Sequence, residues 1–136
     1  MQNEVTIASD RYVDAQIAAR LIASGKVQVE SVVLPRSNVL EYYKLGLGEK
    51  EAIALCLKKG ESILLITDDR LAYIVSDRMR VQKLLLLDLV VELVASRLMS
   101  SALAEEIVKA TEPRYSGGFI AHTLKILERG DRKCLV

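Results

Sequence analysis

Carboxylates gather in one stretch of the sequence, and they are the residues best able to do chemistry. Glu49 and Glu51 open a helical pattern. Asp68 and Asp69 follow an apolar run that reads as a buried strand. Carboxylates held together repel one another and raise their pKa values unless a cation neutralises them. Because oxygen ligands suit Mg²⁺ or Mn²⁺, and such an ion can activate water, the four acids indicate a candidate metal site.

Each of these acids also has an ordinary structural explanation. Acidic residues in the first turn of a helix interact favourably with its dipole, and an Asp after a strand commonly caps the next helix. Either Asp68 or Asp69 can cap the helix expected at residues 69–78. The spacing alone leaves capping and metal binding both open.

Alternating helices and apolar strands must position these acids. Apolar periodicity predicts helices at residues 14–24 and 49–59, each followed by a glycine stop. Residues 27–34 are rich in Val and read as a strand, and residues 62–67 are apolar without alternation, as in a strand covered on both faces. Further helices are expected at 39–44, 69–78, 84–98, 102–110 and 119–129, and a short strand at 79–82. The alternation predicts an α/β layer structure with a parallel sheet.

This topology brings the acids toward one edge of the sheet. The helix at 49–59 is expected to run antiparallel to the strand at 62–67 that follows it. The start of the helix then lies near the carboxyl end of the strand. Ligands of parallel α/β sheets bind outside that end. We therefore expect the four acids to be neighbours.

The bulk composition narrows the classes of function. The chain has 136 residues, which predicts a single domain over residues 1–136, and its net charge is +1. A charge this small gives no overall positive potential that would attract nucleic acid, but it leaves open the presence of a local basic patch. The basic residues after the acids can either contact a phosphate backbone or form a solvated face. They are Arg70, Arg78, Arg80 and Lys83.

Other residues point to a reduced, cytoplasmic setting without a membrane span. Cys56 and Cys134 have no metal-binding spacing, and Cys56 is expected in the core. His122 is the only histidine, so no site built on several histidines is possible. The N-terminus has no pattern of a signal peptide, and charges interrupt the apolar run at residues 81–99. The helix at 84–98 is apolar nearly all round, so it is expected either to be central in the fold or to pair with a partner.

A longer stretch carries a family resemblance. Residues 45–72, LGLGEKEAIALCLKKGESILLITDDRLA, resemble the signature of PIN domains, in the branch of stand-alone, toxin-like prokaryotic members. That signature reads LGxGExEAIALA, then an apolar strand, then TDD, a basic residue and Ala. The flanking segments DAQIAARLIASGKVQV and SRLMSSALAEEIVKA are similar to neighbouring parts of the family, so the resemblance covers residues 4–128.

The resemblance implies a three-layer α/β/α parallel sheet and an endoribonuclease whose Mg²⁺ or Mn²⁺ is held by three or four acids. The family's catalytic acids fall on Glu51 and Asp69, with Glu49 as the alternative to Glu51. Asp68 stands beside the Thr67 hydroxyl, which would face the nucleic acid. The resemblance thus favours Glu51 and Asp69 as ligands and Asp68 as the cap of the next helix. The acid of the family's early helix falls on Glu4. The implied partners are RNA and a small antitoxin protein. Because PIN-like proteins are commonly dimers, the resemblance also favours a homodimer that pairs through the helix at 84–98.

The sequence also departs from the family pattern. The family opens with a strand that ends in an Asp, ahead of the position of Glu4, and this chain has no matching segment. The domain is therefore expected to be shortened at its N-terminus, without the first strand and the first metal ligand. This leaves three functions open: an active nuclease, a non-catalytic PIN-like module that binds RNA or protein, and a purely structural α/β dimer.

Overall fold

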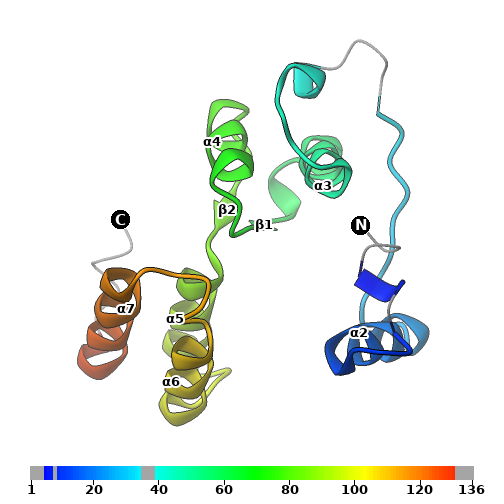
Figure 1. Ribbon diagram of the computed structural model, residues 1–136. Helices are drawn as coiled ribbons and strands as arrows, with labels where there is room; N and C mark the ends of the chain where they lie inside the picture. Colours follow the sequence, from blue (N-terminus) through cyan, green and yellow to red (C-terminus); the bar gives the residue numbers. More distant parts are fainter. Residues whose placement is uncertain (1–4, 8, 35–38, 131–136) are drawn as a thin grey trace. The chain divides into compact units, whose positions relative to one another are not determined.

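The computed structural model describes residues 5–7, 9–34 and 39–130 (Figure 1). Its elements in chain order are α2 (Val13–Ala23), η1 (Val39–Tyr42), α3 (Leu47–Lys59), η2 (Gly60–Ser62), β1 (Leu65–Ile66), α4 (Arg70–Arg78), β2 (Lys83–Leu84), α5 (Leu86–Ala95), α6 (Ser101–Ala110) and α7 (Gly117–Arg129). Within the described ranges, no helix is long and apolar enough to cross a membrane.

The chain divides into two compact units that do not follow the sequence order. The first unit comprises residues 1–65 and 69–82, and the second comprises residues 66–68 and 83–136. The short segment 66–68 therefore belongs with the C-terminal helices, although the chain before and after it belongs to the first unit.

The core of the first unit is formed mainly by α3 and α4. Ile53 of α3 and Val75 of α4 are fully buried in it. The remaining buried members of this core are Leu40, Leu45, Cys56, Leu65, Ala72 and Val81. The residue before α3, Gly46, is in an extended conformation. The helix ends at Gly60, whose φ of 68° is a conformation that glycine adopts without steric cost. The end at Lys59 matches the expected helix at 49–59, and the start at Leu47 lies two residues before the expected one.

The predicted strand at residues 27–34 is not present. This segment has no regular secondary structure, and its side chains Val27, Val29 and Val33 are 45%, 47% and 89% exposed. A strand needs a neighbour to satisfy its backbone N–H and C=O groups. The sheet in the described part of the chain contains β1 and β2 alone, so this segment is not paired in it.

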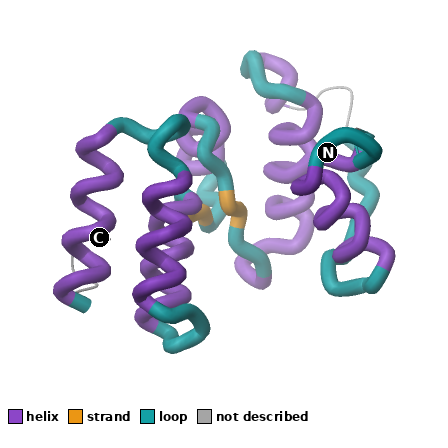
Figure 2. Tube along the Cα trace, turned by 60° about the horizontal axis from the view of Figure 1, so that its bottom comes forward, coloured by secondary structure: helices purple, strands orange, loops and turns teal. Residues whose placement is uncertain are grey.

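The second unit is built on α5, α6 and α7, which lie side by side in Figures 1 and 2. Each helix contributes apolar residues at helical spacing to one core, as Leu87, Val90 and Val91 do from α5. The other buried members are Ala104, Val108, Ile120, Ile126 and Leu127. The apolar α5 is thus central to this unit, which is one of the two arrangements that its composition allows.

The helices α4 and α5 end in the same way, with an arginine in the left-handed region. Arg80 has φ 57° and Arg97 has φ 59°. At each end, backbone N–H groups of the arginine and the next residue bond to carbonyls of the last turn: Val81 N–H to Ser76 O at 2.9 Å, and Leu98 N–H to Leu93 O at 2.8 Å. This is the Schellman arrangement. It stops α5 at Ala95, earlier than the predicted end at residue 98.

The sheet is small and parallel. The N–H of Leu65 donates to Gln82 O at 2.9 Å, and the N–H of Thr67 donates to Leu84 O at 3.1 Å. Each strand has only two residues, so both are shorter than predicted, and the second lies after the expected 79–82. The described part of the chain is mainly helical and contains this one small parallel sheet, which is compatible with the α/β fold class.

Candidate functional site

The first pair of acids lies in the opening turns of α3. Glu49 is the third residue of this helix, and its carboxylate folds back over Gly46, where an added Cβ would lie 2.5 Å from Glu49 Oε2. Glu49 and Glu51 are both half-buried. A carboxylate in the first turn interacts favourably with the helix dipole, so the position of Glu49 has a structural explanation as well as a chemical one.

Asp69 is the N-cap residue of α4, directly before its first residue Arg70. Its Oδ1 accepts a hydrogen bond from the backbone N–H of Ala72 at 2.7 Å. This is the N-cap geometry, in which a side-chain oxygen satisfies an N–H group of the first turn. The expectation that Asp68 is the cap of this helix is wrong, because its neighbour Asp69 holds that position.

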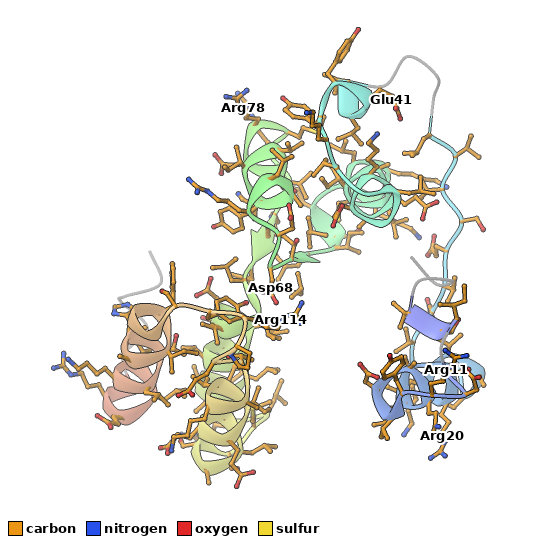
Figure 3. All side chains as sticks on the ribbon, in the orientation of Figure 1. Arg11, Arg20, Glu41, Asp68, Arg78 and Arg114 are labelled. Carbon is orange, nitrogen blue, oxygen red and sulfur yellow. The ribbon has the colours of Figure 1, made fainter. Side chains whose placement is uncertain are left out.

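Asp68 bonds instead within the second unit. Its Oδ1 accepts from the backbone N–H of Leu86, the first residue of α5, at 3.1 Å. The same oxygen accepts from the hydroxyl of Tyr115, which lies between α6 and α7. Figure 3 shows Asp68 at the beginning of α5. Burial raises the pKa of the Tyr115 hydroxyl, and the bond to the Asp68 carboxylate raises it further.

A second carboxylate lies at the same end of α5. Asp88 Oδ2 accepts from the backbone N–H of Leu85 at 3.4 Å, and burial raises the pKa of Asp88. Asp68 and Asp88 thus satisfy two successive N–H groups at the start of one helix. Asp88 is three residues after the N-cap residue Leu85, where an acid can bond back to the N-cap N–H, but Leu85 lacks the hydroxyl that completes the usual sequence motif. No signal in the sequence points to Tyr115.

The described acids do not by themselves form a metal site. Within the ranges that the structure describes, no group of three or more His, Cys, Asp or Glu side chains could hold a metal ion. Asp68 and Asp69 each use an oxygen on a helix N-terminus. Glu4 lies outside the described residues. A divalent ion would therefore need donors beyond those described, and the roles of Glu49 and Glu51 as ligands stay predictions.

The predicted nucleic-acid residues lie in both units. Arg70, Arg78 and Arg80 are exposed in and after α4 of the first unit, and Arg78 is labelled in Figure 3. Lys83 begins β2 in the second unit and is half-buried, as is Thr67, whose N–H bonds to β2. Contact of any of these residues with RNA stays a prediction.

Two other residues have the environments expected of them. Cys56 is buried in the core of the first unit, and burial raises the pKa of its thiol. A neutral, buried thiol is a poor nucleophile. His122 lies exposed on α7. Cys134 falls outside the described residues.

The comparison with known families agrees with the signature at residues 45–72. A family model described as a PIN domain matches residues 1–125. No curated protein matches the chain significantly, and no solved structure does. The match spans most of the 136 residues. The chain therefore belongs to the PIN-domain family, whose fold is nuclease-like.

Proposed function

We propose that the protein acts on RNA as a Mg²⁺- or Mn²⁺-dependent endoribonuclease, the toxin of a toxin–antitoxin pair. The observation that carries the proposal is the PIN-domain match over residues 1–125, because PIN domains typically use divalent metals. In this proposal the protein is a cytoplasmic homodimer that a small antitoxin inhibits. The small sheet of β1 and β2 would then be part of a larger three-layer α/β/α arrangement within a single domain.

Glu51 and Asp69 are the catalytic acids of this proposal, and Glu49 and Glu4 are its further candidate ligands. The described acids form no group of three, so at least one donor would have to come from outside the described ranges. When bound, the ion would supply the charge that activates water and stabilises the phosphate oxygens. The exposed arginines around α4 would contact the phosphate backbone.

Cleavage of labelled RNA tests this proposal. The full chain is incubated with single-stranded RNA and Mn²⁺, with and without EDTA, beside Asp69→Asn. We expect cleavage that EDTA abolishes and that Asp69→Asn reduces about a hundredfold or more, since one ligand carboxylate is removed. Glu128→Gln, at an exposed position on α7, is the control and should cleave as the parent does. Cleavage that persists in EDTA, or a parent that binds no Mn²⁺ in calorimetry, contradicts the proposal.

A second candidate function is a non-catalytic PIN module that binds RNA. The observation that favours it is that the carboxylates of Asp68 and Asp69 each accept a backbone N–H at a helix start. In this case RNA binds without being cut, and its affinity falls steeply with salt. Replacing Arg78 or Arg80 by Ala would weaken binding and reduce the slope of affinity against salt by about one for each phosphate group that the side chain neutralises.

A further inference from the structure

One carboxylate oxygen joins three separate parts of the second unit. Asp68 Oδ1 accepts from Leu86 N–H at 3.1 Å and from the Tyr115 hydroxyl. The first donor opens α5, and the second lies in the connection between α6 and α7. One side chain therefore fixes the end of the β1 segment, the start of a helix and a loop that is 47 residues away in the sequence.

The bond to Leu86 continues the pairing of the parallel strands. Thr67 N–H donates to Leu84 O at 3.1 Å, and one residue further on the Asp68 side chain accepts from Leu86. The backbone ladder is thus followed by a side-chain hydrogen bond at the point where β2 leads into α5. That bond satisfies an N–H group that a helix start leaves without an intrahelical partner.

The hydrogen bonds from Leu86 and Tyr115 give Asp68 a structural role that differs from metal binding. A carboxylate oxygen has two lone pairs in its plane, and Oδ1 of Asp68 accepts from two donors here. Only the other carboxylate oxygen, Oδ2, would then be left to coordinate a metal ion. In the described ranges, no set of three acids that could hold an ion includes this residue.

We propose that Asp68 is a positioning residue, which holds the loop before Asp69 against α5 and Tyr115, and is not a metal ligand. The proposal rests on the proposed function only in treating the neighbouring Asp69 as the functional acid. The feature that matters is a neutral or charged oxygen at the Oδ1 position, because either kind accepts the two hydrogen bonds. A ligand of Mg²⁺ or Mn²⁺ would instead lose affinity with its negative charge, because carboxylates supply most of the protein's hold on such an ion.

Two substitutions of Asp68 separate these roles. Asp68→Asn keeps an acceptor oxygen, so we expect its Tm to lie within about 2 °C of the parent and its Mn²⁺ affinity within about twofold. Asp68→Ala leaves two donors without their acceptor, and we expect its Tm to fall by about 4 °C or more. At a temperature where Asp68→Ala is still folded, its Mn²⁺ affinity should be about tenfold weaker, because the functional loop is no longer supported.

Tyr115→Phe keeps the test decisive if Asp68→Ala does not fold. It removes only the hydroxyl, and we expect its Tm to fall further below the parent than that of Asp68→Asn does; a Tm equal to the parent's would contradict the proposal. Tyr42→Phe is the matched control, because Tyr42 is 87% exposed, and it should melt as the parent does.

The outcomes distinguish this proposal from the proposed function. If Asp68→Asn melts normally but binds Mn²⁺ about tenfold or more weakly, Asp68 is a ligand and the positioning role is overturned. If Asp68→Asn and Asp68→Ala lower the Tm equally, the retained acceptor has no role and the proposal also fails. A parent that binds no Mn²⁺ defeats the proposed nuclease, while the order of the melting temperatures still decides whether Asp68 positions the loop.

Discussion

The carboxylate of Asp69 accepts the backbone N–H of Ala72 at 2.7 Å, so the proposed catalytic acid is also the cap of α4. We expect Asp69→Ala to lower the free energy of unfolding by about 1 kcal/mol, the usual contribution of an N-cap. Asp69→Asn should retain most of that stability, since its amide oxygen can accept the same bond. Urea denaturation followed by circular dichroism measures both values.

A second N-cap provides the control for this prediction. Ser100 Oγ accepts from Leu103 N–H at 3.3 Å at the start of α6. Ser100→Ala should reduce stability by a similar amount and leave any RNA cleavage unchanged. If Asp69→Asn is as unstable as Asp69→Ala, the cap depends on the charge, and loss of activity in Asp69→Asn could not be assigned to chemistry.

Ser76 has a fully buried hydroxyl without a hydrogen-bond partner among the described residues. A buried polar group that lacks a partner costs about 1–3 kcal/mol. We therefore expect Ser76→Ala to be as stable as the parent or more stable. Thr111→Val is the contrasting variant, because the buried Thr111 hydroxyl donates to Val108 O at 2.7 Å and its removal should destabilise by about 1 kcal/mol. A clear loss of stability in Ser76→Ala would contradict the prediction.

The two arginines with positive φ should be sites where glycine stabilises the fold. The left-handed conformation costs a non-glycine residue roughly 1–2 kcal/mol, whereas glycine loses about 0.5–1 kcal/mol more backbone entropy on folding. We expect Arg80→Gly and Arg97→Gly each to gain up to about 1.5 kcal/mol by the difference of these estimates. Arg78→Gly, at the last residue of α4 and without a positive φ, should instead lose up to about 1 kcal/mol.

The same pair tests whether Arg80 contacts RNA. Arg80→Gly should gain stability and lose RNA affinity, while Arg97→Gly should gain stability alone. Filter-binding or fluorescence anisotropy with the same RNA compares them. Equal RNA affinity in both variants would remove Arg80 from the proposed RNA-binding surface.

The ion pair between Lys59 and Glu30 predicts a defined pH response. Lys59 Nζ lies 2.6 Å from Glu30 Oε1, and this hydrogen bond is the main cause that holds the pKa of Glu30 below its ordinary value. A lowered carboxyl pKa contributes stability above its unfolded value, and this contribution is lost as the pH falls through the folded value. Lys59→Met should therefore raise the pKa of Glu30 in an NMR titration of the side-chain carboxyl group.

Lys58 provides the comparison for that titration. Its charge lowers the pKa of Glu30 only as the last of several causes, so Lys58→Met should raise it less than Lys59→Met does. Both effects should shrink at high salt because the pair is exposed. A pKa of Glu30 that does not move in Lys59→Met would show that the pair does not persist in solution.

The helices were predictable from the sequence, and the strands largely were not. Periodic apolar residues placed α3, α4, α6 and α7 within a few positions, because each helix satisfies its own backbone and has a local start and stop signal. The end of α5 was missed because its left-handed position holds Arg97, where glycine is the usual signal. Residues 27–34 have the composition of a strand, but strand formation depends on a partner that composition does not reveal.

In the candidate site too, contacts between residues close in the sequence could be predicted, and contacts between residues far apart in the sequence could not. The cap by Asp69 depends on residues within one turn, so the sequence could suggest it, although it favoured Asp68. The bond between Asp68 and Tyr115 spans 47 positions, and no periodicity in a single sequence encodes such a bond. Family membership was predictable because the signature at 45–72 is contiguous. Whether the four acids form a working site was not, since that depends on the assembled fold.

The interleaved division of the chain has a consequence for how the protein can be cut or recombined. A fragment beginning at residue 83 would contain all three helices of the second unit but would lack residues 66–68. Leu86 and Tyr115 would then both be without the acceptor that Asp68 provides. The two units are thus not exchangeable modules, and a circular permutant would preserve both only if its new ends avoided the segment from 65 to 83.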